Sequence, residues 1–157
     1  MLRGQSKPVS ARTAAWPLLL FSIGGRTLAV RIAEVGAIRP WPGAMSVPSR
    51  TVFVNAVVRY GEDVLPVFDL AGLLKAPVQG ASPMCLIAKR QDGPMAICID
   101  AAIPKLMTVQ ADELYPPSQA DPNVLWECRI EGQAVPIYAM AELGLAPVQA
   151  GKPGSPR

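Results

Sequence analysis

The chain contains no histidine among its 157 residues. Histidine is the commonest general base near neutral pH and a frequent metal ligand, so its absence removes the simplest catalytic and metal-binding schemes. The sequence also lacks a Walker phosphate-binding loop, a G-x-G-x-x-G nucleotide motif and a G-x-S-x-G nucleophile elbow. These absences favour a binding protein over an enzyme, and they predict neither a cofactor nor a metal site.

Cysteines and acidic residues are also too scattered to suggest a reactive cluster. The three cysteines, Cys85, Cys98 and Cys128, form no C-x-x-C pair, and each lies in an apolar run. This placement is typical of small buried side chains in a reducing compartment. The two adjacent acidic pairs, at 62–63 and 112–113, fall in predicted turns or helix starts. Carboxylates at such positions are commonly solvated or cap backbone N–H groups.

No hydrophobic run approaches the roughly 20 residues that cross a membrane. The stretch AAWPLLLFSI, residues 14–23, is short, contains Pro17 and lacks a cleavage site of small residues. We therefore expect neither a secretory signal nor direct membrane insertion.

The basic charge is concentrated at the two ends of the chain. Residues 1–15 and 145–157 carry five Lys and Arg and no acid, whereas residues 16–144 carry ten basic and twelve acidic residues, a net charge of −2. The ends are rich in Pro, Gly, Ser and Ala, which predicts disordered tails at 1–15 and 146–157. The body shows no basic stripe interleaved with aromatic residues, so we expect no nucleic-acid partner.

The body consists of short apolar runs that are separated by turn residues, and it holds most of the 17 prolines and 13 glycines. Such runs are typical of strands. The predicted strands are 18–23, 27–32, 35–38, 52–58, 64–68, 84–89, 95–99, 103–109, 124–130 and 134–138. Helix signals are limited to single turns: one after Asp69 as N-cap, one from Ala139 to Gly144, and one within 108–116. The predicted class is all-β.

One segment of the sequence occurs in two similar copies. RYGEDVLPVFDLAGLL (59–74) aligns without a gap with RIEGQAVPIYAMAELG (129–144), which places Arg59 over Arg129 and Pro66 over Pro136. The order of hairpin, Pro-rich connector, Pro-containing hairpin and short helix also repeats. We predict two pseudo-symmetric subdomains, roughly 18–74 and 84–144, and leave strand exchange between them open. Five short strands in each subdomain bury their apolar faces best as a small barrel.

Four stretches together resemble the CheW-like domain, the adaptor of bacterial chemotaxis signalling, over about residues 16–145. They are LLLFSIGGRTLAVRIAEVGAIRP, VFVNAVVRYGEDVLPVFDLAGLL, MAICIDAAIPKLMTVQADELYP and VLWECRIEGQAVPIYAMAEL. The most specific piece is VLPVFDL, which is similar to the family strand that carries proline and ends in Asp-Leu. The resemblance implies two intertwined SH3-like five-stranded barrels.

The resemblance also implies a function. Members of the family link the cytoplasmic tips of chemoreceptors (methyl-accepting chemotaxis proteins) to the regulatory domain of a CheA-type histidine kinase. They act in the cytoplasm, at receptor arrays that their partners attach to the membrane. With 157 residues, the chain is expected to be a stand-alone adaptor and not the tail of a kinase.

Six residues match family positions associated with coupling. The resemblance implies kinase-interface candidates Val35, Ala37 and Arg39, and receptor-interface candidates Ala56, Arg59 and Gly61. The alternatives without an interface role are core packing for Val35 and ordinary solvated arginines at 39 and 59.

Three of these positions depart from the family pattern, and at one of them Ala56 stands where the family usually has a glycine. Ala37 stands where the family often has an acid, and Gly61 stands where it has an arginine, although Arg59 lies two residues away. The chain is therefore either a coupling adaptor or a divergent paralogue that inhibits or retunes coupling, and a pilus or second-messenger pathway is an alternative setting. A ligand-binding barrel or an enzyme is disfavoured by the missing histidine.

Overall fold

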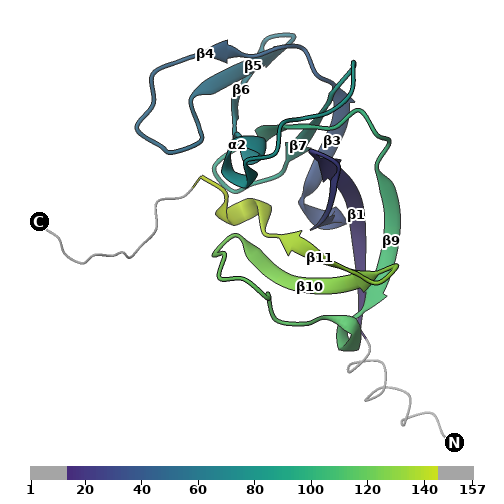
Figure 1. The fold of residues 1–157 in the computed structure, drawn as a ribbon. Coiled ribbons are helices and arrows are strands. Elements are labelled where there is room, and N and C mark those ends of the chain that lie inside the picture. The colour runs from purple at the N-terminus through teal and green to yellow at the C-terminus, as the bar shows by residue number, and fades with distance from the viewer. Residues whose placement is uncertain (1–13, 145–157) are drawn as a thin grey trace, which may run out of the picture.

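The computed structural model describes residues 14–144, which form short strands joined by turns (Figure 1). The strands are β1 (Ala15–Ile23), β2 (Arg26–Arg31), β3 (Val35–Pro40), β4 (Met45–Ser46), β5 (Ala56–Tyr60), β6 (Asp63–Val67), β7 (Met84–Ala88), β8 (Met95–Ile99), β9 (Lys105–Gln110), β10 (Val124–Ile130) and β11 (Gln133–Tyr138). The helical parts are α2 (Leu70–Leu74) and the 3₁₀ turns η1 (Ile32–Glu34), η2 (Ala111–Glu113) and η3 (Met140–Glu142). The predicted all-β class is confirmed. The predicted tails lie outside the described residues, except that Ala15 already belongs to β1.

The strands form two sheets, and each half of the chain contributes to both. The first sheet has the order β10-β11-β2-β1-β9 and the second β3-β7-β8-β6-β5-β4. Strand β1 therefore pairs with β9 from the second half, and β7 pairs with β3 from the first half. Figure 1 shows β1, in purple, running beside β9, in green. We call the two sheets the first and the second barrel; their strands do not follow the division into 18–74 and 84–144.

The two barrels repeat the same strand register. Leu19 pairs with Val30 in the first barrel, and Leu86 pairs with Ile97 in the second, 67 residues later on both strands. The parallel contacts also correspond, since β11 lies against β2 as β6 lies against β8. The repeat seen in the sequence therefore corresponds to a repeated pattern of strand pairing. The first hairpin of each half joins the later strands of the other half to form a barrel.

The repeated prolines occupy equivalent places in this scheme. Pro66 lies one residue before Val67, where β6 meets β8, and Pro136 lies one residue before Ile137, where β11 meets β2. Proline has no backbone N–H to give to a neighbouring strand and is tolerated where no ladder bond needs it. The two prolines thus stand immediately before the parallel contact begins.

Three hydrophobic clusters hold the molecule together. Successive side chains of a strand point to opposite faces, so each hairpin can serve two clusters. Leu18 and Ile137 lie in the interior of the first barrel, and Val58 and Val67 lie in the interior of the second. The largest cluster, the central core, lies between the barrels and joins the outer faces of β1–β2 and β7–β8. Its buried members are Leu19, Phe21, Ile23, Leu28, Val30, Phe68, Leu70, Leu86, Ala88, Met95, Ile97, Ile99, Tyr138, Met140 and Leu143.

The predicted strand 52–58 is wrong in its first half, because β5 begins only at Ala56. Phe53 has φ +66°, outside the strand region, and its ring lies 6.1 Å from that of Phe68. Its carbonyl accepts a hydrogen bond from the N–H of Asp69 at 2.7 Å. Phe53 therefore leaves the strand path and packs against the central core, at the start of α2. The predicted N-cap is confirmed, since Asp69 Oδ1 accepts a hydrogen bond from the Gly72 N–H at 2.9 Å.

The central core leads to a stability prediction. Ile97 is fully buried there, so Ile97→Ala should lower the free energy of unfolding by about 2–5 kcal/mol through lost burial and the remaining cavity. Urea unfolding followed by circular dichroism measures this change. The control is Val64→Ala on the exposed face of β6, where 58% of the residue is accessible and the expected change is within about 0.5 kcal/mol. Equal losses for both variants would contradict the placement of the core.

Candidate functional site

The kinase-interface candidates lie on β3, an edge strand of the second barrel. A register shift between Val35 and Ala37 changes the face to which the following side chains point. Val35 is partly buried against the central core, which agrees with the alternative that it is a packing residue. Ala37 and Arg39 lie opposite Ile87 and Cys85, on the side of the second barrel, and Arg39 is exposed.

The receptor-interface candidates lie on β5 and in the turn that follows it. Ala56 is partly buried against the interior of the second barrel. Arg59 is exposed, and its Nε donates a hydrogen bond to the Gly61 carbonyl at 3.1 Å. Gly61 forms the turn at φ +60°, and the space where a Cβ would lie is open. The arginine side chain thus bends over the turn in which the family pattern has its own arginine.

Tyr60 brings the exposed members of both groups together. Its hydroxyl donates a hydrogen bond to the Pro40 carbonyl at 2.9 Å, which ties the end of β5 to the end of β3. Burial, followed by a hydrogen bond with the Cys85 thiol, raises the pKa of Tyr60, while the positive charge of Arg39 opposes this shift. Arg39, Pro40, Arg59, Tyr60 and Gly61 therefore form one corner of the second barrel, which we call the Tyr60 corner. The sequence analysis did not select Tyr60, although it follows Arg59 directly.

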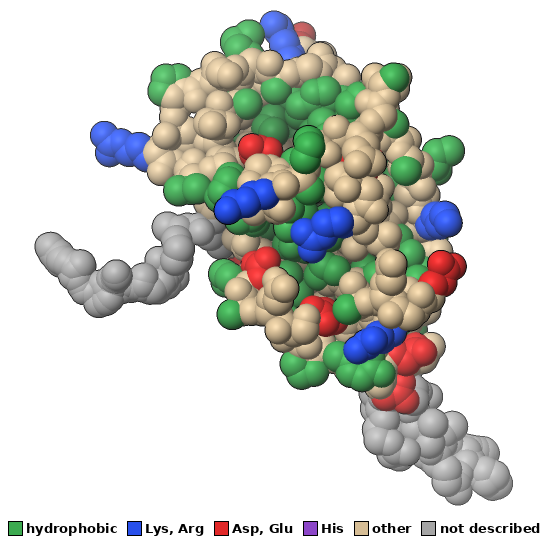
Figure 2. Space-filling view, viewed as in Figure 1, with side chains coloured by type: hydrophobic (Ala, Val, Ile, Leu, Met, Phe, Trp, Pro, Cys, Tyr) green, Lys and Arg blue, Asp and Glu red, His purple; other side chains and the backbone are tan. Residues whose placement is uncertain are grey.

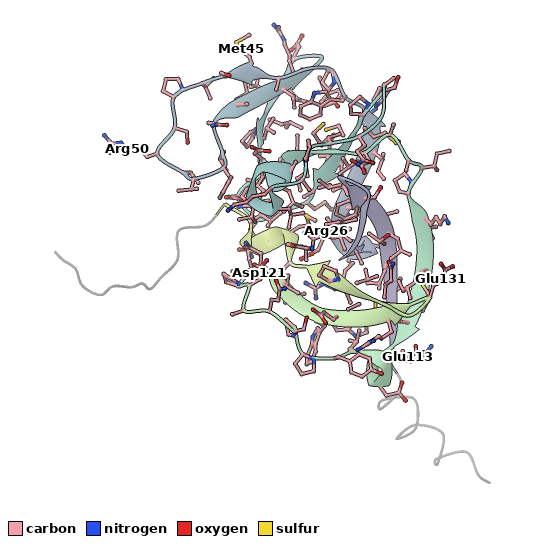
Figure 3. The ribbon with its side chains drawn as sticks, in the orientation of Figure 1. Arg26, Met45, Arg50, Glu113, Asp121 and Glu131 are labelled. Atoms are coloured by element: carbon pink, nitrogen blue, oxygen red, sulfur yellow. The ribbon has the colours of Figure 1, made fainter. Side chains whose placement is uncertain are left out.

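An apolar surface adjoins this corner on the outer face of β4, β5 and β6. Strand pairing places Met45, Val57 and Pro66 in one row. Arg59 and Val64 form the next row of the same face. Met45 is 69% accessible, and Figure 3 shows it on the extended β4 loop together with Arg50.

The equivalent row of the first barrel carries a carboxylate at its centre. It consists of Tyr115, Glu127 and Pro136, each 70 residues after its counterpart. The Glu127 carboxylate accepts hydrogen bonds from the N–H and the hydroxyl of Ser118, at 3.0 and 2.7 Å. The connector 111–123 is thus attached to the strand that it precedes. The two barrels share their pairing but present different outer surfaces.

Asp100 anchors the junction between the barrels, a role that the sequence analysis missed. Its carboxylate accepts hydrogen bonds from the N–H groups of Gly24, Gly25 and Gln79 at 2.8–2.9 Å. Burial opposes ionisation, but the hydrogen bonds from Gln79, Gly25, Gly24 and the Ser22 side chain lower the pKa of Asp100. One buried carboxylate therefore fixes the β1–β2 turn and the connector after α2 against the end of β8.

The C-terminal turn η3 is fixed by two charged side chains. The Glu34 carboxylate accepts a hydrogen bond from the Met140 N–H at 3.0 Å. Arg90 donates to the carbonyls of Met140, at 3.1 Å, and Leu143. Its guanidinium also pairs with Asp92 at 3.1 Å, and only 4% of the Arg90 side chain is accessible. Both contacts join residues far apart in the sequence.

Metal ligands and pockets can be described for residues 14–144. Residues 14–144 contain no group of three or more His, Cys, Asp or Glu side chains placed to hold a metal ion. A shallow pocket of about 140 Å³ lies between β9 and β10, beside Glu113 and Arg129. On the face in Figure 2, basic and acidic side chains are interspersed with hydrophobic ones, and no basic stripe crosses it. None of the helical turns within 14–144 has the length and apolar character that crossing a membrane requires.

Two strand-exchanged barrels with unlike outer faces define an all-β domain. A family model for the CheW-like domain matches residues 17–144, so the chain belongs to the CheW-like family. This is a family of scaffold and adaptor proteins of chemotaxis that are generally non-enzymatic.

A solved structure supports the fold independently. The scaffolding protein TtCheW from Thermoanaerobacter tengcongensis aligns with a TM-score of 0.74 and 13% identity, over 84% of this chain and 89% of that chain. An identity this low shows the shared fold alone. A search of curated proteins finds no match. The predicted fold of two SH3-like subdomains is confirmed.

Asp100 gives a prediction with a pH dependence. Asp100→Asn should lower the free energy of unfolding at pH 7 by about 1–3 kcal/mol, because an amide group replaces one accepting oxygen. The folded-state pKa of Asp100 is depressed, so its contribution is present above the ordinary carboxyl pKa of about 4 and is lost as the pH falls through the folded-state value. Urea unfolding between pH 7 and pH 3 should show the difference from wild type shrinking below about pH 4.

The matched control is Asp112→Asn, an exposed aspartate in η2. This variant should keep the stability and the pH dependence of the wild type. A difference between Asp100→Asn and wild type that stays constant down to pH 3 would contradict the role of the carboxylate charge.

Proposed function

We propose that this protein is a non-enzymatic scaffold that couples chemoreceptors to a CheA-type histidine kinase in bacterial chemotaxis. The observation that carries the proposal is the Tyr60 corner. Exposed residues at the family's kinase and receptor positions, Arg39, Arg59 and Gly61, lie at this corner beside an apolar outer face.

The duplicated fold supports this role. A scaffold that joins unlike partners needs surfaces that differ, and heterologous contacts between different patches extend into rings or arrays. The two barrels repeat the same framework, yet Val57 of the second barrel stands where the first has Glu127, and Met45 stands where the first has Tyr115. The proposal assigns the corner of the second barrel to coupling. The partners are the regulatory domain of the kinase and the cytoplasmic tips of the receptors.

A second candidate function rests on the two positions at which a charged residue of the family pattern is missing. Ala37 and Gly61 replace an acid and a base of the family pattern, and both changes fall on the second barrel. Losing both charges avoids leaving one of them unpaired at an interface. Arg59, bound to the Gly61 carbonyl at 3.1 Å, supplies a positive charge near the turn. These observations favour a retuned coupling adaptor, and an inhibitory paralogue is the competing outcome.

The test is a kinase assay with receptor, kinase and increasing amounts of this protein. We expect the protein to stimulate receptor-dependent kinase activity. Arg59→Glu and Arg39→Glu should each raise the concentration needed for half-maximal stimulation about tenfold, because charge reversal weakens a polar interface without disturbing the core. Thermal melting should be unchanged, since both side chains are exposed.

Arg129→Glu is the matched control, because Arg129 is the exposed counterpart of Arg59 in the first barrel. It should behave as wild type. If melting and stimulation are both unchanged in Arg39→Glu and Arg59→Glu, the site assignment is wrong. A dose-dependent loss of activity with the wild-type protein would favour the inhibitory paralogue.

A further inference from the structure

Two cysteines face each other inside the second barrel. Cys85 on β7 and Cys98 on β8 are direct partners in the antiparallel register, so their side chains point to the same face. Directly opposed residues have Cα atoms about 4.5–5.5 Å apart. Disulfides need about 4.4–6.8 Å, so the strands already provide the required spacing.

The two thiols differ in accessibility. Cys85 is fully buried, whereas Cys98 is only partly buried. Burial and then the neighbouring Cys85 raise the pKa of Cys98 to about 11, and burial also raises the pKa of Cys85. Both groups are therefore thiols at neutral pH, and neither is in a disulfide in this structure. This partial exposure differs from the fully buried placement expected for the cysteines from the sequence.

Cys128 provides an internal comparison. It is fully buried in the first barrel, and its direct partner on β11 is Val135, which offers no second thiol. The 67-residue repeat places Leu18 of the first barrel where the second has Cys85. The opposed pair is thus a feature of the second barrel, on which the Tyr60 corner also lies.

We propose that Cys85 and Cys98 are a redox pair that hydrogen peroxide converts into a cross-strand disulfide, with Cys98 as the attacked thiol and Cys85 as the resolving one. The Cys98 thiol gives up its proton, its sulfur attacks one oxygen of the peroxide and becomes a sulfenic acid, and the other oxygen takes up that proton and leaves as water. Cys85 then attacks the Cys98 sulfur, the S–O bond breaks, and a second water is released. Two thiols and one peroxide give one disulfide and two waters, so two electrons pass from the sulfur atoms to the peroxide.

The pair lies directly beneath the Tyr60 corner. Cys85 is the direct partner of Arg39 in the β3–β7 ladder, and the Tyr60 hydroxyl donates to the carbonyl of Pro40, the residue after Arg39. Oxidation removes the thiol hydrogen and ties the Cys85 sulfur to β8, directly opposite Arg39 in the ladder. The disulfide therefore changes the support of the corner between Arg39 and Arg59. This regulatory consequence rests on the proposed coupling function, whereas the disulfide itself does not.

The experiment treats the full-length protein with hydrogen peroxide, blocks the remaining thiols with an alkylating agent under denaturing conditions, and maps tryptic fragments. Trypsin cleaves after Lys89 and Arg90, between the two cysteines, so only a disulfide keeps their fragments together. We expect linked fragments that dithiothreitol separates, and a fully alkylated Cys128. Cys128→Ala should give the same map, and Cys98→Ala should give no link and an alkylated Cys85.

Two outcomes overturn the disulfide: free thiols at both 85 and 98 after treatment, or oxidation of Cys128 at the same rate as Cys98. Binding to the kinase regulatory domain is then compared for the oxidised and the reduced protein. A few-fold weaker binding that dithiothreitol restores supports regulation, and equal binding overturns it. If even the reduced protein does not bind, the proposed function fails, and the fragment map alone decides the disulfide.

Discussion

The structure depends on burying the outer faces of two equivalent hairpins against each other. A five-stranded sheet of short strands has an apolar inner face, but β1–β2 and β7–β8 are apolar on both faces. The outer faces have to be covered, and each hairpin covers the other between the barrels. Because each hairpin also completes the barrel of the opposite half, neither half of the chain can form its barrel without the other.

This arrangement separates the residues that hold the fold from those that are free to diverge. The central core takes most of its strand side chains from β1, β2, β7 and β8, together with Tyr138 of β11, while β5 and β6 contribute none of its buried members. Val57 and Glu127 illustrate the result, because they occupy equivalent positions in the strand pairing of the two barrels. Val57 is part of an apolar surface, whereas Glu127 accepts a hydrogen bond from Ser118 in the connector 111–123. A duplicated framework thereby supplies two different surfaces, as a scaffold between unlike partners requires.

Local features of the fold were predictable from the sequence, and long-range ones were not. Turn chemistry and proline spacing fixed the hairpins and the repeat, and the Asp69 cap was found where an N-cap was expected. Strand exchange was not decided, because hairpins with the same apolar pattern pair equally well within a half or between halves. Tyr60 and Asp100 were missed because their partners, Pro40 and Gly24, lie 20 and 76 residues away.

Because both barrels share one core, they should unfold as one unit. Amide hydrogen exchange under native conditions tests it most directly, by comparing the slowest amides of β2 with those of β8. Both strands should show the same free energy of opening, equal to that of global unfolding. A distinctly lower value for either strand would show that one barrel opens alone and would contradict the shared core.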